Sequence, residues 1–428
     1  MNWKLSTVVL VVFFLCTVST GYAAVITGEA QIFSTYSLNT GNLDYGTSLR
    51  LKWNPSLSNQ YYFKADVLLK YKDENNYSPI RWNEFYIQGV GTPADNIDFK
   101  LGYFQLTWGA SDMFSPVDNV NPRPFAASLS KDSSDDKIPI LGLDLEWYVN
   151  NDWSIEIVYQ PAFESDFIPA YVEKQLLGYQ IAPATGLNPS TMTINYQAQN
   201  PVVSFTDPIW AVRARGKVGN VDTAVSFYKG YFLSPFPYQT EVTVNQDGSS
   251  TANVDVGYPG KKVLGLEFQG EIPGVDGVTF RGDVALIIPE HWANRISTHQ
   301  GDGTTTLTTV DIFDQPYWKA SLGFDYTADD KTYYNLIFML GNPYEEGQDV
   351  SPYLFLRLEK PSKNDKWKPY LNSALSIEDG SMLNVLGVDY KPQDNWTVSF
   401  TYSIASGGST TKLGRAGSAL SLGIRYVF

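Results

Sequence analysis

The chain has 428 residues, of which 14% are aromatic and 18% are charged, and its formal net charge is −14. This acidic balance argues against a nucleic-acid partner, because phosphate backbones attract basic protein surfaces. Beyond the first 24 residues there is no apolar run of about 18 residues, the length that a membrane-spanning helix requires.

The N-terminal residues 1–23 have the pattern of a signal peptide. Lys4 supplies the positive charge, an apolar core follows, and small residues precede a predicted cleavage near Ala23 and Ala24. The alternative, a membrane anchor, is disfavoured because the apolar core is short. The lone cysteine, Cys16, lies inside this segment. The exported chain is therefore expected to carry no disulfide, thiolate metal site or cysteine nucleophile.

Alternation of apolar and polar residues predicts about eighteen strands after the signal peptide, and a count of sixteen remains open. Each is close to the 9–11 residues that a tilted strand needs to cross a bilayer. The predicted strands are residues 25–38, 44–53, 60–71, 80–90, 97–108, 138–149, 153–160, 209–217, 221–231, 262–272, 278–288, 316–326, 332–340, 352–359, 367–376, 382–390, 396–404 and 418–428.

The connections between these strands alternate in length. Short turns rich in Asn, Asp, Gly and Pro occupy every second connection, and the connections between them are generally longer. Transmembrane barrels show this asymmetry, with short periplasmic turns and long outer loops, whereas a sandwich or propeller gives no reason for it. Aromatic residues gather beside the short turns, as in the aromatic girdles of such barrels, for example Tyr390 and Trp396.

The last strand resembles the C-terminal assembly signal of bacterial outer-membrane β-barrels. The residues that carry the resemblance are Ser421, Gly423, Tyr426 and Phe428. We therefore expect residues 24–428 to form one all-β, transmembrane antiparallel barrel in the outer membrane of a Gram-negative-type bacterium. The resemblance implies outer-membrane lipid and the barrel-assembly machinery as partners, with a homotrimer as a candidate assembly.

The third long connection, residues 109–137, contains too much Pro, Asn and Asp for a regular strand. Around it, residues 81–123 resemble a segment of porin-like outer-membrane proteins, with Trp-Gly, an Asp, aromatic-x-Pro-x-Asp and then Asn-Pro. The match departs after Gly102, where relatives often carry Arg-Gln. In porins the third loop folds inward and narrows the pore. The resemblance thus implies a constriction formed by Trp108, Asp112, Phe114, Asp118 and Arg123.

Strand parity places a set of basic residues on the lumen face of the early strands and of the last strand, which closes against the first. They are Arg50, Lys52, Lys64, Lys70, Lys100 and Arg425. A basic wall opposite the acidic loop residues is expected to set a transverse field. The alternative is a solvated polar lumen with scattered charges.

Two further outer segments have recognisable patterns. Residues 161–208 form the longest connection, in which residues 168–179 are compatible with a short helix across the mouth of the barrel. Whether this connection plugs the pore stays open. Residues 238–256 have the pattern of a hairpin standing above the membrane.

No pattern for catalysis, a metal or a cofactor is present. His291 and His299 lie in one outer loop without the spacing of a zinc site or a triad, and phosphate-binding fingerprints are absent. We predict a porin that passes small hydrophilic solutes passively through a water-filled, charge-lined pore, and not an enzyme. The alternatives are a substrate-specific channel for sugars or small aromatic or lipid-like molecules, and a surface adhesin or structural barrel.

Overall fold

The computed structural model describes residues 26–72, 80–112, 114–124, 137–408 and 410–428. The predicted signal peptide, residues 1–23, and part of the predicted third loop, residues 125–136, lie outside the described residues. Among the helices that are described, none has the length and apolarity needed to cross a membrane.

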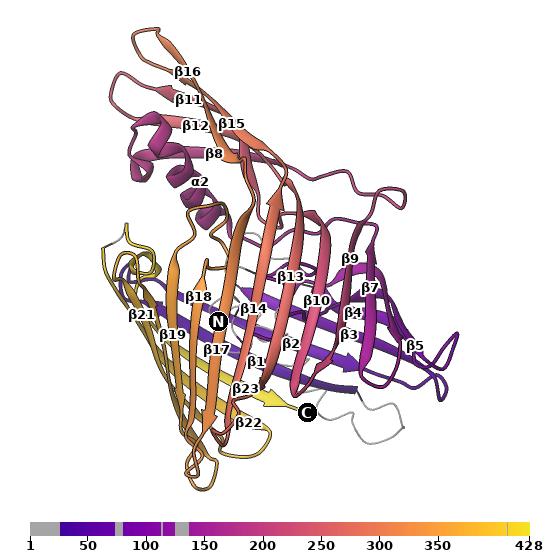
Figure 1. Ribbon diagram of the computed structural model, residues 1–428. Helices are drawn as coiled ribbons and strands as arrows, with labels where there is room; N and C mark the ends of the chain where they lie inside the picture. The colour runs from indigo at the N-terminus through magenta and orange to yellow at the C-terminus, as the bar shows by residue number, and fades with distance from the viewer. Residues whose placement is uncertain (1–25, 73–79, 113, 125–136, 409) are drawn as a thin grey trace.

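Eighteen antiparallel strands form one closed barrel, which confirms the predicted fold and strand count (Figure 1). The ring closes where the first strand pairs with the last, from Glu29 opposite Val427 to Ser37 opposite Ala419. Closure pairs both edges of the sheet and leaves no open ladder of backbone groups. The wall strands are β1 (Ile26–Ser37), β2 (Leu43–Trp53), β3 (Tyr61–Lys72), β4 (Ile80–Gly89), β5 (Ile97–Phe104), β6 (Ile140–Tyr148), β7 (Trp153–Gln160), β9 (Ile209–Val218), β10 (Val221–Tyr231), β13 (Gly260–Glu271), β14 (Val278–Pro289), β17 (Tyr317–Thr327), β18 (Tyr333–Leu340), β19 (Pro352–Glu359), β20 (Trp367–Ser376), β21 (Met382–Tyr390), β22 (Trp396–Ser406) and β23 (Ala419–Val427).

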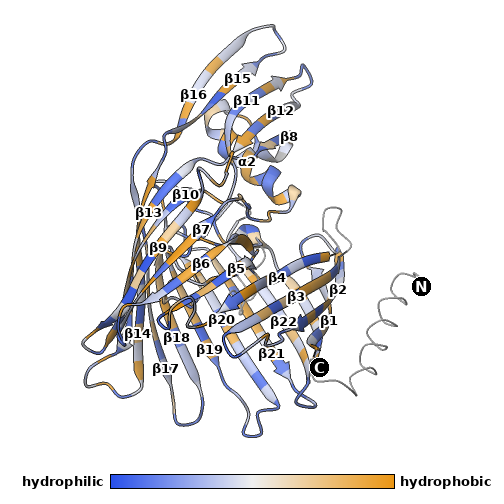
Figure 2. Cartoon of the chain, turned by 90° about the vertical axis from the view of Figure 1, so that its right-hand side faces the viewer, coloured by the Kyte–Doolittle hydropathy of each residue, from blue (hydrophilic) through white to orange (hydrophobic). Residues whose placement is uncertain are grey.

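The two faces of the wall differ as the sequence alternation predicts. In β17, Leu322 and Phe324 are exposed on the outside of the barrel, whereas Ser321 and Asp325 are buried on the inside. Apolar residues also recur along the other wall strands (Figure 2). The inside is not polar everywhere, because Val158 on β7, Ala211 on β9 and Ile337 on β18 are buried there. Large apolar side chains exposed on the outside are the reverse of a soluble globular domain, and they are typical of a barrel surrounded by lipid.

Aromatic rings gather at the end of the barrel that carries the short turns. The rings of Trp367 on β20 and Tyr390 on β21, which are cross-strand partners, stack with centroids 4.2 Å apart. Those of Trp396 on β22 and Tyr426 on β23 lie 4.7 Å apart. Two connections at the opposite end, residues 38–42 and 377–381, are also short, so the length asymmetry is a tendency and not a strict rule.

A second sheet stands beyond the mouth of the barrel, together with a helix (Figures 1 and 2). We call it the outer domain, and it is assembled from three long loops. A core of its own joins helix and sheet through Leu177, Ile181, Val242, Val254 and Ile296. Its elements are α2 (Ala170–Thr185), the 3-10 turn η2 (Pro189–Thr191), β8 (Met192–Gln199), β11 (Phe236–Val244), β12 (Ser250–Gly257), β15 (Trp292–His299) and β16 (Thr305–Phe313).

Only part of the outer domain follows from the sequence. The predicted hairpin is confirmed as β11 and β12, and the predicted helix is present, although it spans Ala170–Thr185 and not residues 168–179. The strands β8, β15 and β16 were not predicted. β15 and β16 form a hairpin with each other, with His299 opposite Thr305. The pairings that join these strands to the rest of the sheet, β11 parallel to β15 and β12 parallel to β8, span long stretches of chain and leave no local pattern.

The fifth wall strand is shorter than predicted, because β5 ends at Phe104 and not at residue 108. Beyond it the side chain of Asn121 replaces the neighbouring strand. Its Oδ1 accepts a hydrogen bond from the Leu106 N–H at 2.7 Å, and its Nδ2 donates to the carbonyls of Phe104 at 3.1 Å and Ile138 at 2.9 Å. The Asn121 side chain thus pairs with backbone groups that a neighbouring strand would otherwise satisfy, and the chain can leave the wall at this point.

Gly102, near the end of β5, is expected to be irreplaceable for a steric reason. Its φ is +135°, and a Cβ there would lie 2.3 Å from the Phe85 carbonyl oxygen and 2.9 Å from the Tyr86 Cα. Gly102→Ala should destabilise the barrel by about 1–3 kcal/mol, the usual range for imposed backbone strain. Urea unfolding of protein refolded into detergent measures this, followed by tryptophan fluorescence.

Gly423→Ala is the matched control, because the nearest atom to a Cβ at that position is 3.9 Å away. It should unfold at the same urea concentration as the unsubstituted chain. Equal stability of the two variants would contradict the steric assignment. Refolding into detergent also separates this packing effect from any role of Gly423 in assembly inside a cell.

Candidate functional site inside the barrel

A stretch of chain leaves the wall after β5 and runs inside the barrel. We call residues 105–124 the inner segment, of which residue 113 lies outside the described residues. Its main chain is held by carboxylates of strands across the lumen. The Gly109 N–H donates to Glu267 on β13 at 2.9 Å, and the N–H groups of Ala110 and Ser111 donate to Asp283 on β14 at 2.8 and 2.9 Å.

The predicted constriction residues Asp112 and Phe114 continue this contact with the opposite wall. The Asp112 carboxylate pairs with Arg281 on β14 and accepts a hydrogen bond from the Asn335 side chain on β18 at 3.2 Å. The Lys319 ammonium lies 5.0 Å from the centre of the Phe114 ring, which also packs against an apolar cluster on β18 and β19. The inner segment therefore spans the lumen.

The other three predicted constriction residues lie in the interior of the packed region. Asp118 is buried and pairs with both Arg123 and Lys137, so its charge is balanced by neighbours in the same loop. Trp108 is only 1% exposed, with the Arg213 guanidinium 5.1 Å from its ring. Structural support of the inner segment is the role that these contacts indicate for Trp108, Asp118 and Arg123.

The inner segment fills one side of the lumen and leaves the other side accessible. Inner-face residues of the strands beside it are buried, as Val158, Ala211, Val263 and Ala285 show, and they form one cluster with Trp108. Inner-face residues of β22, β23 and β1 are at most partly buried. We call this accessible part, the inner face of β22, β23, β1 and β2, the open side.

Three of the six predicted wall cations are neutralised by carboxylates on the next strand. Arg50 pairs with Asp66 at 2.7 Å, Lys64 pairs with Glu84, and Lys100 pairs with Asp144 at 3.1 Å. Sequence reasoning did not single out Asp66 and Glu84. The same strand parity that selected the cations identifies Asp66 as a lumen residue, since it lies two positions after Lys64 on β3.

The remaining predicted wall cations also come from lumen-facing positions. Lys70 lies opposite Ser48 on β2 and has interactions of its own. Lys52 lies opposite Thr27, and Arg425 lies opposite Gln31. Neither Lys52 nor Arg425 forms an ion pair with any residue that the structure describes. Glu29 on β1 lies on the same face, between the positions opposite Lys52 and Arg425. Near its short-turn end the open side therefore carries two cations and one carboxylate, which leaves one net positive charge.

The residues of the predicted assembly signal lie along the closing seam. The Ser421 and Thr35 hydroxyls are hydrogen bonded at 2.9 Å, and the Tyr426 ring packs on Trp396 on the outside. The Phe428 ring covers Gly28, where a Cβ would approach it to 2.9 Å. These contacts describe how the seam is packed, and the role of the signal in assembly stays a prediction.

The longest loop is joined to the inner segment around the half-buried carboxylate of Asp166, beside a main-chain hydrogen bond of 3.1 Å from the Phe167 N–H to the Arg123 carbonyl. Asp166, at the start of the longest loop, accepts hydrogen bonds from the Arg123 N–H at 2.7 Å and the Ser234 hydroxyl at 2.9 Å. Its own N–H donates to the Leu233 carbonyl at 2.9 Å. Burial raises the pKa of Asp166 above its usual value. Three loops thus meet at this side chain.

Comparisons with known proteins add little to this geometry. No protein-family model and no curated protein matches the chain. Solved structures of engineered variants of the porin from Rhodopseudomonas blastica are similar, with TM-scores of 0.44, 0.44 and 0.42 at 9%, 10% and 10% identity. Each alignment covers 94% of this chain and 99% of the other. The assignment of an 18-stranded barrel therefore rests on this chain's own strand pairing.

Asp283 is predicted to hold the inner segment in place. In Asp283→Ala the N–H groups of Ala110 and Ser111 lose their acceptor, which costs about 1–3 kcal/mol for each group left buried. With Ala110→Cys as a reporter, thiol labelling of the folded protein should accelerate by about tenfold or more. The chain's one cysteine, Cys16, lies in the predicted signal peptide, and the experiment uses protein that begins at Ala24 and so lacks it.

Asp222→Ala is the control for this experiment, because Asp222 is an exposed carboxylate whose Lys217 partner lies 3.8 Å away. It removes the same charge close to Ala110, since both residues line one pocket, but it takes away no hydrogen bond of the inner segment. Equal labelling rates in the Asp283 and Asp222 variants would show that the two hydrogen bonds do not restrain the segment.

Asp166 is predicted to make the junction of the three loops pH-dependent. Because its folded pKa is raised, the protonated carboxyl favours the folded junction, and this stabilisation is lost as pH rises through the folded pKa. Hydrogen exchange near Arg123 and Ser234, corrected for intrinsic rates, should speed up over that range. Asp166→Asn should remove the pH dependence, and a variant that retains it would exclude Asp166 as its source.

Proposed function

We propose that this protein is a porin-like channel of an outer membrane that passes small hydrophilic solutes passively. The observation that carries the proposal is the open side, a largely polar inner face that the inner segment leaves uncovered. Thr397, Ser399 and Thr401 on β22 and Gln31 and Thr35 on β1 contribute uncharged polar groups to it. Such a surface hydrates a passage without binding a solute tightly.

We infer that passage is limited by the inner segment and biased by a small number of charges. Asp112 and Phe114 lie where the segment crosses the lumen. Three cations of the wall are balanced by carboxylates, so they contribute little net field, since opposite charges in contact cancel at a distance. Lys52 and Arg425 are not balanced in this way and favour anions at the short-turn end.

The cellular setting belongs to the same proposal. Residues 1–23 direct export and are removed near Ala23, after which residues 24–428 enter the outer membrane as one unit. The apolar exterior of the wall and the rings beside the short turns support contact with outer-membrane lipid. The proposal includes recognition of the last strand by the barrel-assembly machinery and assembly into a homotrimer.

A second candidate, display of a binding surface outside the cell, is favoured by the outer domain. Its sheet and helix have a core separate from that of the barrel, which is more structure than a simple loop requires. Planar-bilayer recordings with a panel of solutes distinguish the candidates. Stepwise ion conductance supports the channel, and its absence supports display. Saturable block by one solute would favour a substrate-specific channel.

The charge assignment gives a sharper expectation for selectivity. Lys52→Glu combined with Arg425→Glu should move the reversal potential in a salt gradient toward cations, because both residues are unpaired on the open side. The control combines Lys64→Gln with Glu84→Gln, which removes a cation and its carboxylate together and should leave the reversal potential unchanged. A shift in the control that equals the shift in the test variant would refute the assignment.

A further inference from the structure

Among the wall residues that the structure describes, those on the outside of the barrel are uncharged, apart from two lysines. By the alternation along each strand, the charged residues of the eighteen wall strands face the lumen, with the exception of Lys229 on β10 and Lys262 on β13. Lys229 is exposed between the inward-facing Tyr228 and Gly230, and Lys262 is exposed between the buried Lys261 and Val263. These two exceptions are direct cross-strand neighbours.

The position of this lysine pair along the barrel is defined by the rows of side chains around it. One step from the lysine pair toward the short-turn end, cross-strand pairing aligns a row of outward-facing residues on β9, β10, β13, β14 and β17. This row is wholly apolar and consists of Val212, Phe227, Leu264, Leu286 and Trp318. The next row toward the outer domain consists of Trp210, Lys229, Lys262 and Ile288. The outer face thus changes from apolar to charged between two successive rows, as expected where hydrocarbon gives way to headgroups.

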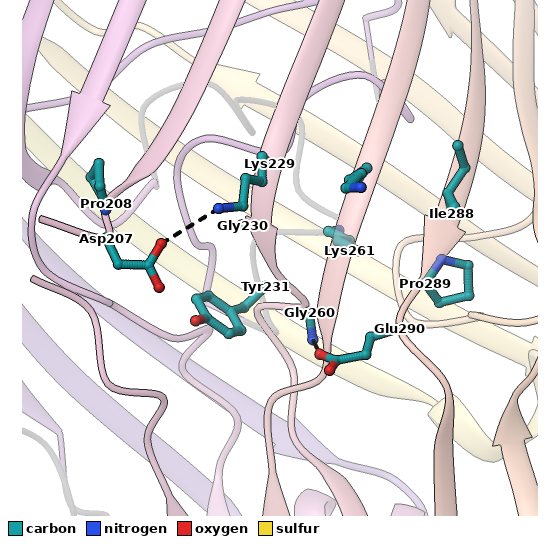
Figure 3. A pocket seen from close by; sticks show the side chains of 11 residues that line it. Asp207, Pro208, Lys229, Gly230, Tyr231, Gly260, Lys261, Ile288, Pro289 and Glu290 are labelled. Carbon is teal, nitrogen blue, oxygen red and sulfur yellow. Dashed lines mark hydrogen bonds and ion pairs between the residues drawn. The ribbon is translucent and has the colours of Figure 1, made fainter.

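A cavity of about 340 Å³ opens on the outer surface at this row (Figure 3). Tyr231, Ile288 and Pro289 line it together with the two lysines. Asp207 reaches the Lys229 ammonium at 3.4 Å, in a pair that is exposed on both sides. Glu290, at the far edge, accepts the Gly260 N–H at 3.3 Å. Lys262 has no ion partner among the described residues.

Two lysines directly opposite each other raise the electrostatic energy of the wall unless an anion lies near both. Like charges directly opposite each other on neighbouring strands repel, because their Cβ atoms are only about 4.5–5.5 Å apart. Two carboxylates also lie at the cavity. Asp207 pairs with Lys229, and Glu290 forms its hydrogen bond with the Gly260 N–H. Neither forms an ion pair with Lys262, so its ammonium group, beside an apolar wall, complements a phosphate carried on a hydrocarbon anchor.

We propose that Lys229 and Lys262 form a binding site for the phosphorylated headgroup of an outer-leaflet lipid. The acyl chains lie along the row that contains Phe227 and Leu264, and the phosphate sits between the two ammonium groups. This inference rests on the proposed outer-membrane location. It adds a specific lipid contact on the outer surface, which is separate from the lumen and from the residues assigned to passage.

The test uses the full exported chain in detergent micelles doped with a glucosamine-based lipid that carries two phosphates. Native mass spectrometry measures the lipid that stays bound, with the dephosphorylated lipid as comparison. Each lysine near an anionic membrane surface contributes a factor of about five, so Lys229→Gln with Lys262→Gln should lower retention about 25-fold. Asp207→Asn should raise retention, because it frees the Lys229 ammonium.

A matched control removes two neighbouring lysines from the other end of the barrel. Lys366 and Lys391 lie on adjacent short turns, joined by a backbone hydrogen bond of 2.8 Å, and both are exposed. Lys366→Gln with Lys391→Gln should leave lipid retention unchanged. An equal loss in both double variants, or no loss in the Lys229 and Lys262 variant, would overturn the site.

Two further results separate this inference from its alternatives. Displacement of the lipid by inorganic phosphate at the same concentration would overturn the lipid site in favour of a site for free anions. Conductance is recorded in parallel on the same preparations. Lysine-dependent retention in a chain that shows no conductance would support the lipid site and refute the channel, so the two proposals fail independently.

Discussion

The structure depends on one constraint, which is that every backbone N–H and C=O within a hydrocarbon layer needs a partner inside the protein. A closed ring of strands meets this requirement, and the pairing of β1 with β23 completes the ring. Strand alternation then follows, because side chains on a closed wall have only two directions to face. The apolar exterior and the polar lumen are both consequences of closure.

The inner segment meets the same constraint by other means. Once the chain leaves β5 it has no neighbouring strand, and its N–H groups are satisfied by side chains. The side chain of Asn121 accepts a hydrogen bond from the Leu106 N–H, and that of Glu267 accepts one from the Gly109 N–H. Asp283 accepts hydrogen bonds from two further N–H groups of the segment. Carboxylates on wall strands therefore have a structural role in addition to any effect on solutes. Charged residues in the lumen cannot be assigned to selectivity by their orientation alone.

Some cations of the barrel wall form ion pairs with carboxylates, and others do not. The wall cations Arg50, Lys64 and Lys100 have carboxylate partners one strand away, which spares each charge the penalty of burial alone. Lys52 and Arg425 on the lumen face, and Lys262 on the outer face, have none among the described residues. These unpaired cations are the residues on which the proposals of ion selectivity and of lipid binding depend.

The amino-acid sequence was enough to predict a barrel of about eighteen strands, with sixteen left open, because a period of two and turn chemistry are local features. It did not determine where β5 ends, since that is decided by Asn121, which is distant along the chain. Nor did it reveal that Asp66 and Glu84 balance the wall cations, or that β8, β15 and β16 build an outer domain. Only the tertiary structure decided these points, because each depends on contacts between residues far apart in sequence.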